Sequence, residues 1–93
     1  MIIGLCTLEF HLPASRNLKE KRKFLKSFRD RVSNRFNVAV SEIDHHDLWQ
    51  RSSIGVVSIS VAREPLDRMF QKVLREAENQ AEAQLISVDI EFF

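Results

Sequence analysis

Apolar side chains recur with two different periods along this chain of 93 residues, and the order of those periods limits the folds open to it. Four segments alternate apolar and polar positions, which is typical of strands with one buried face. Two other segments have apolar positions three or four residues apart, which is typical of helices with one buried face. The predicted order is strand, helix, strand, strand, helix, strand, with the strands at residues 1–12, 37–44, 53–63 and 85–93.

Local signals set the ends of the two predicted helices. Asn17 and Glu20 form an N-x-x-E arrangement, a variant of the capping box, so we expect the first helix to begin at Leu18. It should end between residues 34 and 37. Proline suits the first position of a helix, and Pro65 therefore predicts the start of the second one.

This order of elements is that of the ferredoxin-like, split β-α-β fold. We predict one domain over residues 1–93, an α+β sandwich in which both helices cover the same face of a four-stranded antiparallel sheet. Alternation places Val57, Ile59 and Val61 toward the helices. The opposite, open face should then carry Ile3, Leu5, Thr7, Val56, Ser58, Ser60, Ser87, Asp89 and Glu91.

Composition excludes several classes of protein. Hydrophobic residues make up 44% of the chain and charged residues 29%, as in ordinary globular domains. No apolar run approaches the ~20 residues of a membrane span, and residues 1–5 do not resemble a signal peptide. A single cysteine, Cys6, excludes an internal disulfide framework. We therefore expect a cytoplasmic protein that does not contact a membrane.

Positive charge is concentrated in residues 16–35. This segment has nine basic and two acidic residues, a net charge of +7, whereas the whole chain is only +1. On a helix that turns about 100° per residue, five of the cations share one outward face. Lys21 falls inside the apolar arc at the first turn, and Arg31 and Arg35 border that arc on its other side. The five on the outward face are Lys19, Arg22, Lys23, Lys26 and Arg29.

Such a face is unfavourable for an isolated helix, because like charges four residues apart cost about 0.2–0.5 kcal/mol per pair. It is the pattern expected of a surface that binds nucleic acid. We predict that the five cations contact RNA phosphates and that Lys21, Arg31 and Arg35 add to the rim. Trp49 and Arg51 could stack on a base. A face that only keeps the protein soluble accounts for the charge about as well.

Two other functions stay open. The chain contains no complete catalytic signature, so we favour a binding protein without a cofactor over an enzyme. His45, His46 and Asp47 could nevertheless serve a metal-dependent enzyme, although their spacing matches no defined metal site. The open sheet face has no predicted aromatic residue, which argues against base stacking there. Its apolar part instead suggests a homodimer, whose basic face would meet an acidic protein.

Several motifs together resemble the YlxP-like family of small bacterial proteins of unknown function. The resemblance covers essentially the whole chain and implies a ferredoxin-like fold with no established reaction. Genes of that family often lie near genes for translation initiation and ribosome maturation, which implies ribosomal RNA as the anionic partner. The motifs are Leu8-x-x-His11-Leu12-Pro13, Asn17-Leu18-Lys19-Glu20-Lys21-Arg22, Arg35-Phe36-Asn37-Val38, Glu42, and Asp47-Leu48-Trp49-Gln50-Arg51.

Overall fold

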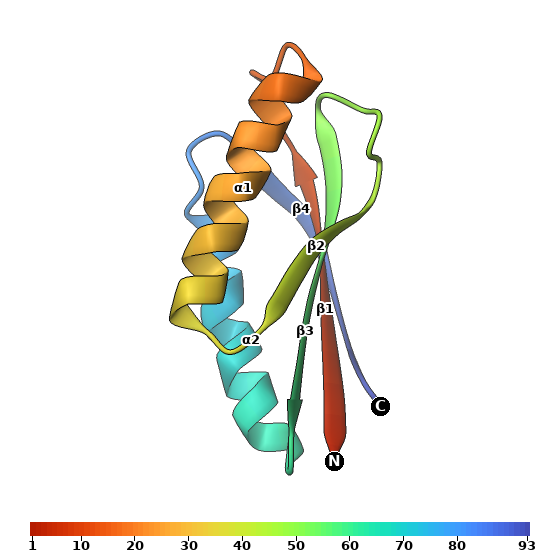
Figure 1. Ribbon diagram of the computed structural model, residues 1–93, viewed down its shortest axis with the longest axis vertical. Helices are drawn as coiled ribbons and strands as arrows, with labels where there is room; N and C mark the ends of the chain where they lie inside the picture. Colours follow the sequence, from red (N-terminus) through yellow and green to blue (C-terminus); the bar gives the residue numbers. More distant parts are fainter.

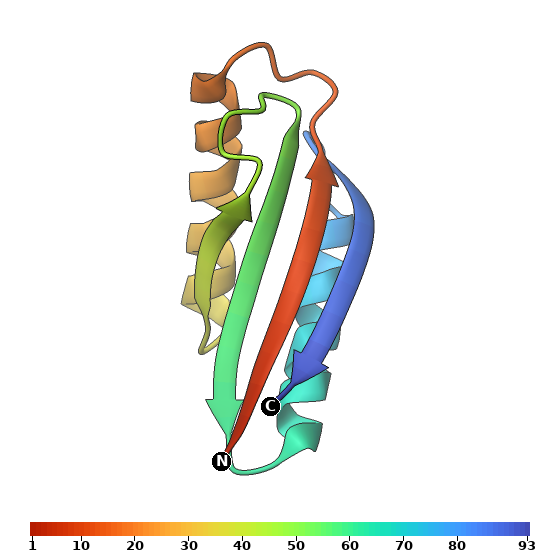
Figure 2. The ribbon, with the colours of Figure 1, turned by 90° about the vertical axis from the view of Figure 1, so that its right-hand side faces the viewer.

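A computed structural model describes all 93 residues and confirms the predicted order of elements. The four strands form one antiparallel sheet in the order β2-β3-β1-β4. Both helices cover one face of this sheet (Figure 1), and no helix covers the face seen in Figure 2. The fold is therefore ferredoxin-like, as predicted. Its elements are β1 (Ile2–His11), α1 (Leu18–Arg35), β2 (Ala39–Asp44), β3 (Arg51–Ser60), α2 (Arg63–Glu78) and β4 (Gln84–Phe92).

The predicted start of α1 is confirmed. The amide of Glu20 donates to Asn17 Oδ1 at 2.9 Å, while Glu20 Oε2 accepts from the amide of Arg16 at 2.8 Å. The glutamate thus reaches one residue further back than in a capping box. By contrast, α2 begins at Arg63, two residues before the predicted start at Pro65. Pro65 still lies in the first turn, where backbone N–H groups have no acceptor within the helix and a proline therefore costs no hydrogen bond. Neither helix is long and apolar enough to cross a membrane.

The core lies between the sheet and the helices. The inward residues of β1 are buried as predicted, with Cys6, Leu8 and Phe10 fully enclosed. The ring of Phe10 packs edge-on against Phe24 and Phe28 of α1, with centroid distances of 5.5 and 5.4 Å. This aromatic cluster holds α1 against the middle of the sheet.

The predicted orientation of the third strand is wrong. Cys6 pairs with Val56 and Leu8 with Ile54, so Val56 faces the core, whereas Val57 and Ile59 lie on the open face. Val61 lies beyond the end of β3 and is 93% exposed. The error arises because the apolar residues of the alternating stretch, Val57 and Ile59, lie on the open face, while the serines that alternate with them lie on the helix side.

The last strand departs from its predicted pattern at one point. The pairing of β1 with β4 shifts by one residue between Glu9 and Phe10, so Leu85 lies opposite Phe10 while Ile86 is half exposed. A bulge of this kind reverses the faces of all residues on one side of it. Beyond the bulge, Ile90 and Phe92 pack against the core as predicted.

Candidate nucleic-acid interface

Five basic side chains of α1 lie exposed on its surface, as the helical wheel predicted. They are Lys19, Arg22, Lys23, Lys26 and Arg29. Arg29 lies 3.5 Å from its neighbour Asp30, whereas the other four form no ion pair within 4.0 Å. Four cations of this helix thus remain available to an external anion.

Three of these residues line a groove between α1 and β2. Arg22, Lys26 and Arg29 belong to its helical wall, while Val40, Ser41 and the Lys21-paired Glu42 belong to the strand wall. The groove has a volume of about 370 Å³. Because β2 is an edge strand, one row of its backbone N–H and C=O groups has no strand partner. We call the groove with these three basic side chains the cationic groove.

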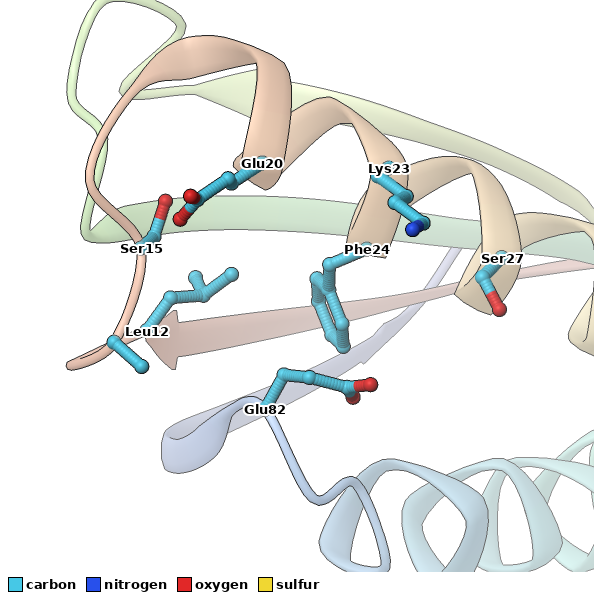
Figure 3. A pocket seen from close by; sticks show the side chains of 8 residues that line it. Leu12, Ser15, Glu20, Lys23, Phe24, Ser27 and Glu82 are labelled. Atoms are coloured by element: carbon cyan, nitrogen blue, oxygen red, sulfur yellow. The ribbon is translucent and has the colours of Figure 1, made fainter.

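Lys23 lies at the edge of this basic face that is farther from β2. It lines a shallow cavity of about 320 Å³ together with Glu20, with Phe24 and with Glu82 from the segment before β4 (Figure 3). Two carboxylates around one ammonium group make this cavity unfavourable for a phosphate. Lys23 therefore marks the border of the basic surface, and its centre lies toward β2.

Lys21 does not belong to the rim, and that prediction is wrong. Its side chain is 1% exposed, and its Nζ lies 3.0 Å from Glu42 Oε2. Nζ also donates to the carbonyl of His45 at 2.7 Å, while Ser52 Oγ donates to Glu42 Oε2 at 2.7 Å. A lysine inside an apolar helical stripe requires a buried acceptor, and Glu42, one of the residues that carry the family resemblance, supplies it.

Arg31 and Arg35 bind to the second helix. Arg31 Nε lies 3.3 Å and Arg35 Nη1 3.5 Å from carboxylate oxygens of Glu76, and Arg31 also donates to Gln80. These contacts join α1 to α2 at the far end from the loop between β2 and β3. The predicted role of both arginines in binding an anion is not tested by this arrangement, in which the two guanidinium groups share one carboxylate.

The loop between β2 and β3 presents Trp49, which is 54% exposed, beside the start of α1. The loop is held there by Lys21 and by Gln50, whose Nε2 donates to the carbonyls of Pro13 and Ser15 at 3.3 and 3.2 Å. Arg51 turns instead to the open sheet face, where its guanidinium lies 3.7 Å from Glu9. Figure 1 shows this loop at the end of the molecule where α1 begins, and Trp49 is exposed on it.

The histidines predicted as alternative metal ligands diverge. His45 adopts a left-handed backbone conformation (φ 63°) and its Nε2 lies 3.8 Å from Glu9, whereas the ring of His46 contacts the carbonyl of Glu42. No three His, Cys, Asp or Glu side chains are grouped closely enough to hold a metal ion. The structure therefore does not assemble His45, His46 and Asp47 into a metal site.

Cys6 is not available as a nucleophile. Burial raises the pKa of its thiol to about 12, and the negative charge of Asp89 adds to this shift. The reactive thiolate is therefore scarce in the folded protein at neutral pH.

We expect iodoacetamide at pH 8 to leave Cys6 unmodified until the protein is unfolded. The unfolded thiol loses its proton above about pH 9 and the folded one only near pH 12, so stability should fall as the pH rises through this window. At pH 10 the free energy of unfolding should be lower by about 1 kcal/mol, a decrease that Cys6→Ala should not show. Labelling of the native protein at the unfolded rate would contradict the burial of this thiol.

Comparison with known proteins gives the family. A family model described as "Protein of unknown function (DUF503)" matches residues 3–90. The chain belongs to this family. It is also 41% identical over 73 residues to "Uncharacterized protein YlxP" of Bacillus subtilis (strain 168), an alignment that covers 78% of this chain and 79% of the relative. Membership in the DUF503 family confirms the resemblance to YlxP-like proteins.

Proposed function

We propose that this DUF503 protein is a non-catalytic RNA-binding module that associates with ribosomes, and that the cationic groove holds RNA phosphates. The observation that carries the proposal is the division of charge on α1. Lys19, Arg22, Lys23 and Lys26 form no ion pair, whereas Lys21 pairs with Glu42 and the two arginines near the end of the helix share the single carboxylate of Glu76. Unmatched cations on one face are the electrostatic footprint of nucleic-acid binding.

The shape of the surface favours a single strand. The basic side chains from Lys19 to Arg29 cover about 15 Å of helix, and three of them line a groove along an extended strand edge. Phosphates in this groove would leave the bases of a single strand free. Trp49 lies at the end of the molecule where α1 begins and could stack on one of them, an interaction worth about 1–3 kcal/mol.

Neutralising two cations of the helical wall tests the groove directly. Affinity of the wild type for a short single-stranded RNA should fall about a hundredfold between 50 and 200 mM salt if five phosphates are bound. In Arg22→Gln/Lys26→Gln, we expect weaker binding at low salt and a log–log salt slope shallower by about 1.4. Fluorescence anisotropy across a salt series measures both quantities.

The matched control removes the same charge from the other helix. Arg68 and Lys72 are exposed on α2 and form no ion pair within 4.0 Å. Arg68→Gln/Lys72→Gln should therefore bind RNA with nearly the affinity and salt slope of the wild type. Equal losses in both double variants, or no RNA binding by the wild type, would contradict the proposal. The second of these results would favour an acidic protein as the partner of α1.

Trp49 is the single tryptophan of the chain, so its fluorescence reports on this loop alone. Stacking on a base should quench that fluorescence as RNA is added. Trp49→Ala should bind about tenfold more weakly, which corresponds to about 1.4 kcal/mol. Unchanged fluorescence at saturating RNA would exclude Trp49 from the interface while leaving the cationic groove to the salt experiment.

A further inference from the structure

The open sheet face carries an apolar region at one end that no element covers. Val57 lies beside Leu5 and Ile59 beside Ile3 in the pairing of β3 with β1. The amide of Phe93 donates to the carbonyl of Ile3 at 2.8 Å and the reverse bond is 3.2 Å, so these two residues also lie directly opposite each other on one face. We call these five residues, Ile3, Leu5, Val57, Ile59 and Phe93, the apolar band.

The apolar band is both exposed and continuous. Ile59 is 61% and Phe93 65% exposed, with Ile3 between them on β1, and Val57 is exposed as well. Ile43 extends the band across Gly55, since a Cβ on that glycine would lie 3.1 Å from Ile43 and 3.7 Å from Leu5. Contiguous apolar surface of this kind on a globular domain marks an interaction site.

The other end of the same face is polar and contains an unsatisfied acceptor. Ser53 donates to Glu9 Oε1, but Glu9 Oε2 is buried and has no hydrogen-bond partner. The nearest cationic groups, Arg51 Nη2 and His45 Nε2, are 3.7 and 3.8 Å away. This end of the face thus carries a carboxylate flanked by two cationic groups, whereas the other end is apolar.

We propose that the open face binds a second copy of this chain, with the two sheets face to face and related by a twofold axis parallel to the strands. Because β3 and β1 are the two central strands, this rotation places β3 of one copy over β1 of the other. The rotation keeps each residue's position along the strand, so Val57 lies over the partner's Leu5 and Ile59 over the partner's Ile3. A twofold axis perpendicular to the strands and in the plane of the sheet would instead place the apolar end of one copy over the polar end of the other.

The same rotation matches the polar ends. Arg51 of β3 lies opposite His11 of β1, and Glu9 lies two residues before His11 on the same face of β1. In the dimer, Arg51 lies over the partner's His11 row, next to the row of the partner's Glu9, so cationic and anionic side chains of the two copies face each other. The surface is therefore complementary to itself in both hydrophobicity and charge, as an isologous interface requires.

The size of the face sets the strength of the dimer. Strands of this length at about 4.8 Å spacing make a face on the order of 500 Å² per copy, so the dimer buries on the order of 1,000 Å², near the lower limit of specific interfaces. Aligned sheets pack about 10 Å apart with a small angle between their strands. We therefore expect reversible association between about 1 µM and 1 mM.

Ile59→Lys is the test, because this side chain is mostly exposed and its replacement leaves the core unchanged. In sedimentation equilibrium, the wild type should shift from monomer to dimer with concentration, and Ile59→Lys should remain monomeric. The control Gln71→Lys adds the same charge to the exposed side of α2 and should dimerise like the wild type. A wild type that stays monomeric to about 1 mM, or an Ile59→Lys variant that still dimerises, would overturn the proposal.

Mixing two variants separates loss of the interface from loss of the fold. Ile59→Lys and Ile59→Glu should each be monomeric alone, and an equimolar mixture should form a heterodimer, since the two Ile59 positions lie close to the twofold axis. Failure of the mixture to associate would overturn the proposed axis. RNA binding by Ile59→Lys should match that of the wild type, because the cationic groove lies on the other side of the sheet.

Discussion

Replacing Lys21 with methionine is expected to lower the free energy of unfolding by about 3–5 kcal/mol. Methionine can fill the same apolar space, but it leaves Glu42 as a nearly buried carboxylate without its cation. It also removes the donor to the carbonyls of His45, His46 and Arg51, at 2.7, 3.3 and 3.3 Å from Nζ. The loss therefore comes from stranded polar groups and not from a cavity.

Urea unfolding measures this loss, and a double-mutant cycle assigns it to the pair. Lys21→Met/Glu42→Leu should cost clearly less than the sum of the two single changes, because no unpaired charge remains buried. Lys19→Met, on the exposed side of the same turn, should lie within about 0.5 kcal/mol of the wild type. A Lys21→Met loss as small as that of Lys19→Met would show that the buried pair does not form.

The buried lysine also links stability to the proposed function. Lys21 holds both ends of the loop that presents Trp49, so its removal should loosen the loop relative to α1. We expect Trp49 fluorescence of folded Lys21→Met to shift toward that of a fully solvated indole. The cationic groove itself loses no exposed cation in this variant. A decrease in RNA affinity would have two sources, the looser Trp49 loop and the unpaired carboxylate of Glu42, which lines the cationic groove.

Gly4→Ala is expected to destabilise the protein by about 1–3 kcal/mol through overpacking. A Cβ at this position would lie 2.6 Å from Cε2 of Phe70 and 3.3 Å from Leu66, and both side chains are buried. The close approach of α2 to β1 thus leaves room only for hydrogen at residue 4. Neither the ring nor the helix can move aside without disturbing the core.

Thermal and urea unfolding of three further variants test this explanation. Phe70→Leu removes the ring that the new methyl group would contact, so Gly4→Ala should cost less in that background than in the wild type. Gly55→Ala is the matched control, because its Cβ would lie 3.1 Å from Ile43, a half-exposed side chain that can move. An equal cost for Gly4→Ala with and without Phe70→Leu would exclude the steric explanation.

Local signals account for the parts of the fold that were predicted correctly. The start of α1 depends on Asn17 and Glu20, which contact each other within one turn. The inward face of β1 follows from alternation over ten consecutive residues, since one face of this strand packs on both helices. The exposed cations of α1 were found in the same way, because the period of a helix alone places them.

The errors lie where a contact joins distant parts of the chain. The face of β3 was misassigned because alternation alone put Val57 and Ile59 inward, whereas the pairing with distant β1 places both on the open face. The sequence also gave no sign that Phe93 lies beside Ile3, since that position depends on the register of β4. Both errors concealed the apolar band, which appeared in the sequence as a smaller and less continuous surface.

The basic segment shows most clearly what each level determines. The sequence by itself determined the order of elements, the ends of α1 and the presence of five outward cations, because period and capping act within a few residues. Only the tertiary structure decided that Lys21 is buried against Glu42, that Arg31 and Arg35 are bound by Glu76, and that Arg22 lines a groove. A charge becomes structural or available according to the residues that folding brings beside it, and those residues lie far away in the chain.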